Sequence, residues 1–218
     1  MSCSPQNDPF PPAAFDEWAA HYDDDISGDG FPFTGYSRVL SETVRLANAS
    51  AGMSVLDLGA GTGNLAERFI ALGCEVWGTD FSSEMLEAAR AKLPQARFLL
   101  HDLRQPFPVA LQRRFDRIVS AYVFHHFELP EKLALIEQLL AHSLNPGGSL
   151  LLADISFPTT QALNAVRAAA GEQWDEELYW VAEDVLPLLA ARDIRAVYQQ
   201  VSDCAGVYQF SIHKGSYD

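Results

Sequence analysis

The sequence has few cysteines, few basic residues and no long apolar run. Its three cysteines, Cys3, Cys74 and Cys204, are too scattered among 218 residues to form a disulfide framework or a clustered metal site, so a reducing cytoplasm is the expected setting. No apolar run approaches the roughly 18 residues of a membrane span, and the first residues lack a signal-peptide pattern. We therefore expect a cytoplasmic protein without a membrane partner.

Acidic residues greatly outnumber basic ones. With 15 Lys and Arg against 29 Asp and Glu, the formal charge is −14. Proteins bind nucleic acids largely through Lys and Arg on phosphates, so this balance disfavours a DNA or RNA partner. The composition instead favours a small-molecule substrate, and it leaves the oligomeric state open.

The length and the 48% of hydrophobic residues fit one globular domain. We expect a flexible, Pro-rich tail at 1–14, an N-terminal lid with helices at 15–52 and a core at 53–218. One amphipathic helix is predicted over 15–22, because four apolar residues recur there at helical spacing: Phe15, Trp18, Ala19 and Tyr22. Trp18 is expected to anchor this helix, and a mobile loop with the acidic run 23–25 is expected to follow.

From residue 53 onward, short apolar runs alternate with helical segments, which is typical of a parallel sheet covered on both faces. Strands are predicted at 53–58, 75–79, 97–101, 115–120, 149–154, 194–201 and 206–213. Helices are predicted at 64–72, 82–92, 131–143, 160–170 and 182–192. The last two strands are joined by a short link and must be antiparallel.

A glycine-rich loop joins the first of these strands to a helix in VLDLGAGTGNL, where Gly59, Gly61 and Gly63 let a ligand approach the backbone. The spacing differs from the G-x-G-x-x-G of dinucleotide sites, and Asp57 precedes the first glycine. A carboxylate there repels phosphate but suits an ammonium group, such as that of S-adenosylmethionine.

Two further acids follow the next two strands. Asp80 stands where a carboxylate accepts hydrogen bonds from a ribose diol, and Asp102 could accept one from an adenine amino group. Each acid alone also fits a capping or solvated role. Together with the glycine loop, the three acids favour a nucleoside-containing cofactor.

The segments VLDLGAGTGNL, GTDFS, HDLRQPFP, FDRIVSAYVFHHF and LNPGGSLLLADISF resemble, in this order, the motifs of class I S-adenosylmethionine-dependent methyltransferases. The preceding FDEWAAHYDDDISG resembles the lid of small uncharacterised members from bacilli. The resemblance implies an α/β, Rossmann-like class I methyltransferase sandwich with a mixed seven-stranded sheet and an antiparallel last strand. It also implies a set of cofactor contacts: Asp57, Gly59 and Gly61 at the methionine portion, Asp80 at the ribose, Asp102 at the adenine amino group, Phe81 and Leu103 beside the adenine ring, and Ser120 and Tyr22 elsewhere.

Methyl transfer needs an acceptor held in line with the methyl carbon, and a base where the acceptor carries a proton. His125 or His126 is the candidate base, although either could instead hold its loop or ligate a metal. Tyr122, like Tyr22, is a candidate to face the sulfonium, with packing as the alternative. The spacing of Cys, His and acidic residues predicts no metal site.

Later side chains are less informative. Asp154 could face the acceptor or close a loop, and Trp174, Tyr179 and Trp180 could shape the acceptor pocket, whereas the acids at 175–177 are expected to form a solvated face. The Asn/Asp-Pro-Pro-Tyr/Phe motif is absent after the strand at 115–120, and no cysteine is placed as a nucleophile. We expect methyl transfer to a small molecule. A non-catalytic S-adenosylmethionine-binding module and an NAD(P)-dependent oxidoreductase remain as alternatives.

Overall fold

A computed structural model describes residues 11–28 and 30–212 of the chain. Most of the expected tail, residues 1–10, lies outside the described residues, as does residue 213 of the last predicted strand. None of the helices in the described ranges is long and apolar enough to cross a membrane.

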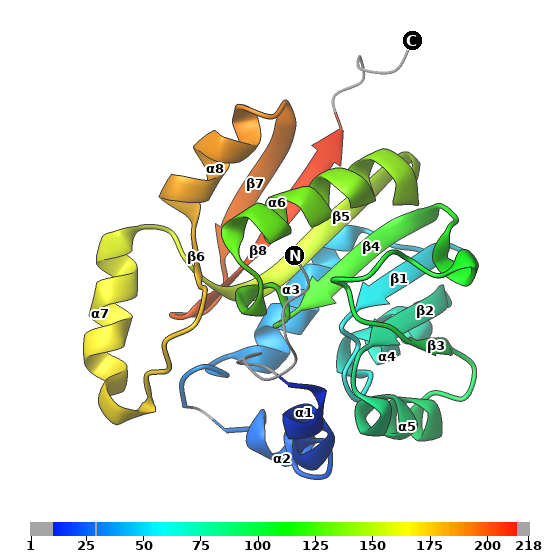
Figure 1. The fold of residues 1–218 in the computed structure, drawn as a ribbon, viewed down its shortest axis with the longest axis horizontal. Helices are drawn as coiled ribbons and strands as arrows, with labels where there is room; N and C mark the ends of the chain where they lie inside the picture. Colours follow the sequence, from blue (N-terminus) through cyan, green and yellow to red (C-terminus); the bar gives the residue numbers. More distant parts are fainter. Residues whose placement is uncertain (1–10, 29, 213–218) are drawn as a thin grey trace.

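A twisted mixed sheet forms the centre of the molecule (Figure 1). Its strands follow the order β3-β2-β1-β4-β5-β8-β7, and a two-residue strand pairs with the end of β5 beside this path. The strands are β1 (Ser54–Leu58), β2 (Glu75–Asp80), β3 (Arg97–Leu100), β4 (Phe115–Ala121), β5 (Leu144–Phe157), β6 (Trp180–Val181), β7 (Ile194–Gln200) and β8 (Ala205–Ile212).

The strand β8 runs antiparallel to both of its neighbours, β5 and β7, which confirms the predicted mixed sheet with a reversed last strand. The order reverses beside β1, since β2 lies on one side of β1 and β4 on the other. Open α/β sheets bind ligands at such a switch point, outside the carboxyl ends of the strands. The topology therefore places a site after β1 and β4.

Helices cover both faces of the sheet (Figure 1). One core packs α6 and α8 against the sheet, and the other packs α3 and α4. The helices of the core are α3 (Tyr36–Ala47), α4 (Asn64–Ala71), α5 (Ser83–Lys92), α6 (Leu129–Gln138), α7 (Thr160–Ala170) and α8 (Ala182–Ala190). Short 3₁₀ turns are η1 (Val109–Leu111), η2 (Phe124–His126) and η4 (Gly171–Gln173), and a π-turn, η3 (Leu139–Ser143), extends α6.

Local signals in the sequence set several helix ends. The hydroxyl of Ser82 accepts a hydrogen bond from the backbone N–H of Met85 and so caps α5. Gly73 adopts the left-handed conformation beyond α4. The helix α6 begins at Leu129, slightly before the predicted start, because Pro130 fits its first turn.

The N-terminal segment differs from the single helix predicted over 15–22. It forms α1 (Pro12–Trp18) and, after a break, α2 (Tyr22–Asp25), so the acidic run lies in a helix instead of a loop. The indole N–H of Trp18 donates to Asp25 Oδ2 at 2.6 Å across this break. A side-chain hydrogen bond of this kind competes with a continuous helix, and the spacing of apolar residues does not reveal it.

Candidate active site

A cavity of about 480 Å³ opens at the carboxyl ends of the central strands, and α1 and α2 lie beneath those ends in Figure 1. One end of the cavity follows β2 and β3, and the other follows β4 and β5. Its walls include Phe15, Trp18, Tyr22, Gly59, Gly61, Asp80, Phe81, Asp102, Leu103, Tyr122, His125, His126, Glu177 and Tyr179.

The glycine loop after β1 borders the cavity with bare backbone. Gly59 has φ +69°, and a Cβ there would lie 2.3 Å from Cγ2 of Val123. Gly61 also has a positive φ, +52°. Because L side chains rarely adopt this conformation, the loop requires glycine for its shape as well as for access.

Asp80 ends β2 with its carboxylate held beside this loop. Oδ2 accepts a hydrogen bond from the backbone N–H of Gly61, and Oδ1 accepts one from that of Ser82, both at 2.9 Å. Burial raises the pKa of Asp80, while these two donors oppose the rise. The carboxylate lines the cavity, as the predicted ribose contact requires.

Asp57 lies deeper than predicted and does not line the cavity. Its side chain is 1% exposed, and among the described residues Oδ2 has no hydrogen-bond partner. Burial and the nearby Asp80 raise the pKa of Asp57 to about 7. Although the carboxyl has a backbone hydrogen bond at Ala66, its buried Oδ2 without a partner is costly, so this position suits a cationic group close to the glycine loop.

Asp102, Leu103 and Phe81 meet at the end of the cavity that follows β2 and β3. Oδ1 of Asp102 accepts a hydrogen bond from the backbone N–H of Arg104 at 2.9 Å, which orients the carboxyl. The ring of Phe15 packs edge-on against Phe81, with 4.9 Å between centroids. The predicted adenine contacts are thus brought together, and α1 covers them.

We call α1 and α2 the lid. Two acidic residues, one on each helix, join the lid to the core. Asp16 Oδ1 accepts a hydrogen bond from the Ser82 hydroxyl at 2.6 Å. Asp23 accepts from Thr62 at 2.6 Å and from Asn64 at 2.8 Å, and Lys92 Nζ lies 3.1 Å from its Oδ2. These bonds hold α1 and α2 against the core, where both helices also line the cavity.

Ser120 is not brought to the cavity. Its side chain is 1% exposed, and its hydroxyl donates to the carbonyl of Leu58 at 2.7 Å, between β4 and β1. Ser120 is among the predicted cofactor contacts, but its hydroxyl is committed to Leu58 and does not face the cavity. Its position as the last residue of the predicted strand gave no indication that the side chain points to the neighbouring strand.

Tyr122 follows β4 and lines the cavity beside Gly59 and Tyr22. It has φ +58°, an uncommon conformation for a bulky residue. Its buried hydroxyl has no hydrogen-bond partner among the described residues. Strained residues with unsatisfied polar atoms are typical of ligand sites.

His125 is buried and paired with Asp154, with 2.6 Å between Nδ1 and Oδ1. The other oxygen of Asp154 accepts from the indole of Trp180 at 2.8 Å. Burial lowers the pKa of His125, but Asp154 and Glu177 outweigh it and the pKa lies above its ordinary value. Asp154 therefore neither faces the acceptor nor closes a loop: it orients His125.

Glu177 contradicts the predicted solvated face. Its side chain is only 14% exposed, and Oε2 lies 3.6 Å from Nε2 of His125. His126 lies against His125, with 4.0 Å between ring centroids, and burial and neighbouring cationic groups lower its pKa to about 2. The sequence could not pair Glu177 with the histidines, because the contact depends on the fold between them.

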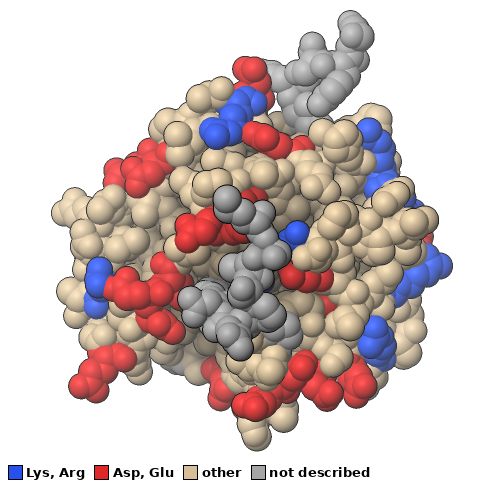
Figure 2. All heavy atoms as spheres, in the orientation of Figure 1, with Lys and Arg blue, Asp and Glu red and all other residues tan. Residues whose placement is uncertain are grey.

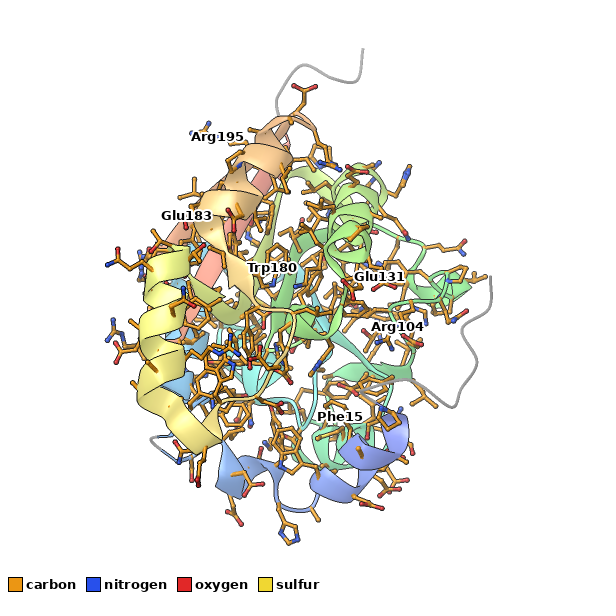
Figure 3. All side chains as sticks on the ribbon, turned by 60° about the vertical axis from the view of Figure 1, so that its left-hand side comes forward. Phe15, Arg104, Glu131, Trp180, Glu183 and Arg195 are labelled. Carbon is orange, nitrogen blue, oxygen red and sulfur yellow. The ribbon has the colours of Figure 1, made fainter. Side chains whose placement is uncertain are left out.

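The aromatic residues at 174–180 divide into different roles. Tyr179 lines the cavity. The indole of Trp174 stacks on Phe31 behind this wall, with 4.9 Å between centroids. Trp180 lies in the interior near α8 (Figure 3) and holds Asp154.

The chain matches a family model described as a methyltransferase domain over residues 55–148. An uncharacterized methyltransferase of Geobacillus kaustophilus is 33% identical over 192 residues, which cover 82% of this chain and 85% of the relative. One from Oceanobacillus iheyensis is 31% identical over 201 residues, covering 87% and 91%. The chain belongs to the class I S-adenosylmethionine-dependent methyltransferases. A solved DhpI–SAH complex shares this methyltransferase fold, with a TM-score of 0.70, 18% identity and coverage of 93% and 95%.

S-adenosylmethionine is the cofactor of this methyltransferase family, and the residues present fit it. The partnerless oxygen of Asp57 suits the ammonium group. Asp80 and Asp102 are carboxylates that can accept from a ribose and an adenine, and Phe81 offers a flat apolar wall between them.

Proposed function

We propose that the protein transfers a methyl group from S-adenosylmethionine to a small molecule bound at the His125 end of the cavity. The observation that carries this proposal is the continuity of one cavity from Asp80 and Asp102, at the cofactor end, to His125 and Tyr179. The cofactor supplies an electrophilic methyl group when bound. The chain's own residues must position the acceptor, exclude water and accommodate its proton.

The lid and the aromatic walls would exclude water. Phe15, Trp18 and Tyr22 line the cavity from α1 and α2, and Phe31 and Tyr179, with ring centroids 6.0 Å apart, line it from other segments. A dry site strengthens the electrostatic contacts within it. The ring of Tyr22 and the ring of Tyr122 are suited to face a sulfonium cation.

His125 is the residue that we propose contacts the acceptor. In its neutral form His125 donates Nδ1–H to the Asp154 carboxylate, which leaves the lone pair of Nε2 for a polar hydrogen on the acceptor. His126 is held by ring contacts with Phe15 and His125, and it is proposed to shape the site. Tyr122 would orient the acceptor or the cofactor through its hydroxyl.

The surface supports a small acceptor over a nucleic acid. In Figure 2, acidic side chains gather along the lower edge of the face shown, where α1 and α2 lie, whereas basic side chains lie mainly at the right. The acids at 23–25 belong to α2, next to the cavity. A polyphosphate would be repelled there.

Labelled S-adenosylmethionine and a cell extract separated into metabolite, protein and RNA fractions test the proposal. We expect label to pass to a low-molecular-weight product only with the wild-type protein, and to be lost with Asp80→Ala, which should no longer hold the cofactor. Tight binding of S-adenosylhomocysteine without transfer to any metabolite fraction would instead favour a binding module. Transfer confined to a protein or RNA fraction would contradict the small acceptor.

A further inference from the structure

Three side chains that can ligate a metal converge at the His125 end of the cavity, which we call the acceptor end because we propose that the acceptor binds there. The ligand atoms of His125, His126 and Glu177 all lie within 4.8 Å of one another. The 3.6 Å between His125 Nε2 and Glu177 Oε2 is long for a hydrogen bond. Two ligands of a tetrahedral ion at about 2.0–2.2 Å are roughly 3.3–3.6 Å apart, so this pair already has the spacing of a metal site.

The tautomer of His125 suits a metal ligand. Asp154 accepts from Nδ1 at 2.6 Å, which leaves the lone pair on Nε2, the nitrogen nearer to Glu177. Asp154 is itself fixed by the indole of Trp180 and by the backbone N–H of Ile155, at 2.8 and 2.9 Å. A carboxylate that orients a histidine is the usual outer partner of a metal-bound imidazole.

The segment that carries Glu177 is tied to the histidine turn. The backbone N–H of Leu178 donates to the carbonyl of His125 at 3.1 Å, and Lys132 Nζ donates to the carbonyl of Leu178. Lys132 also lies over the ring of Trp180, 4.8 Å from its centroid. The three ligand-bearing residues are therefore held together by contacts that do not involve their ligand atoms.

The local charge favours a cation. Once His125 is neutral, as a metal ligand must be, the carboxyl groups Asp154, Glu177 and Asp175 lie in or beside the cluster, against the two cationic groups Lys132 and Arg104. Lys132 is committed to a carbonyl and an indole ring, and Arg104 lies over the ring of Phe127, 5.2 Å from its centroid. A divalent ion would offset the excess of carboxylates.

We infer that His125, His126 and Glu177 bind a divalent transition-metal ion such as Zn²⁺, with an open position toward the cavity. Two imidazoles and a carboxylate suit Zn²⁺ and similar ions, whereas Mg²⁺ prefers oxygen ligands. The inference rests on the proposed function and changes one detail of it: with Nε2 of His125 on the ion, the open position of the ion, in place of the Nε2 lone pair, would meet the methyl acceptor. It replaces the expectation of no metal, which considered only spacing along the chain.

Zn²⁺ titration of the full-length, tag-free protein tests this site, with S-adenosylhomocysteine titrated into the same preparation. We expect one bound Zn²⁺ that excess Mg²⁺ does not displace. Glu177→Gln should weaken it by at least about 100-fold, and Asp154→Asn by about 10–100-fold, the range for an outer partner. Glu176→Gln is the matched control and should stay within about twofold, because Glu176 is exposed and pairs with Arg167.

Equal Zn²⁺ affinity in the wild type and Glu177→Gln, or no saturable binding to the wild type, would overturn the inference. If Glu177→Gln does not fold, His126→Asn replaces it, and the visible absorption of added Co²⁺ reports nitrogen and oxygen ligation in the wild type. A spectrum of hydrated Co²⁺ would count against the site. If the protein binds S-adenosylhomocysteine normally but binds no Zn²⁺, this inference alone is wrong. If it does not bind S-adenosylhomocysteine, the proposed function is wrong.

Discussion

The backbone N–H of Gly61 donates a hydrogen bond to Asp80 Oδ2 at 2.9 Å, which joins the glycine loop after β1 to the end of β2. One carboxylate therefore shapes the loop and also faces the cavity. The two motifs that the sequence places 19 residues apart act as a single structural unit. Changes at either residue should consequently alter cofactor binding.

Asp80→Ala should weaken binding of S-adenosylhomocysteine by about 1.5–3 kcal/mol, the range for hydrogen bonds to a charged group. Calorimetric titration measures the change. Glu75→Gln, at the opposite end of β2 and paired with Arg97, is the control and should bind normally. An unchanged affinity in folded Asp80→Ala would move the ribose site elsewhere.

Asp57 should make cofactor binding depend on pH. Its pKa of about 7 in the folded protein exceeds the ordinary value of 3.8. Its contribution to stability is therefore present below about pH 4 and lost as the pH rises through about 7. An ammonium partner favours the ionised form, so affinity for S-adenosylhomocysteine should rise by up to about tenfold per pH unit below pH 7 and then level off.

Calorimetry between pH 5.5 and 8 checks this dependence, and buffers of different ionisation enthalpy report the proton released on binding. Asp57→Asn should bind more weakly at pH 8 and lose most of the pH dependence. A profile identical to that of the wild type would show that another group titrates.

The lid should become more rigid when the nucleoside binds. Asp23 ties α2 to Thr62 and Asn64, and Phe15 covers Phe81. Hydrogen exchange at residues 15–28 should slow when S-adenosylhomocysteine is added, while α8 remains unchanged. Asp23→Asn should release the ligand roughly fivefold faster, which corresponds to about 1 kcal/mol. Equal exchange with and without ligand would contradict a lid.

Gly59→Ala should reduce both stability and binding. A Cβ there would overlap Val123, and φ is +69°, so we expect a loss of about 1–3 kcal/mol in the free energy of unfolding. Denaturant unfolding measures it. Adding Val123→Ala removes the overlap but not the backbone strain, so recovery should be partial. Complete recovery would show that the overlap alone requires glycine.

The mixed sheet, and the meeting of the glycine loop with Asp80, were predictable because their signals are local. Hydrophobic runs mark buried strands, and the loop before Asn64 and the carboxylate of Asp80 stand at strand ends, where topology brings them together. The reversed strand followed from the short link near Cys204. The break after Trp18 was not predictable, because an indole bond to Asp25 decides it.

The acceptor end depends on contacts between distant segments. Glu177 reaches His125 only because β6 pairs with β5 and the backbone of Leu178 bonds to the histidine turn. In the sequence, an acidic run beside aromatic residues is indistinguishable from a solvated face. Ser120 is the opposite case, a residue predicted at the site that bonds elsewhere. Its hydroxyl donates to the carbonyl of Leu58 on the neighbouring strand, which the sequence spacing does not reveal.

His125→Ala should lower turnover on the eventual acceptor by about 10²–10⁴-fold, the usual contribution of a group that handles a proton in the transition state. Affinity for S-adenosylhomocysteine should stay within about twofold, because the proposed cofactor contacts follow β1, β2 and β3. A residue that only holds its turn would instead lower the thermal midpoint and cofactor affinity along with turnover.

Asp154→Asn separates positioning from contact with the acceptor. Asparagine keeps the shape and can still accept from Nδ1 or from Trp180, but it removes the charge that stabilises the imidazolium. Turnover should fall less than in His125→Ala, and the double variant should be no slower than His125→Ala alone, since both changes act through one imidazole. Full turnover in His125→Ala would show that alignment and exclusion of water supply the rate, as for an acceptor that carries no proton to lose.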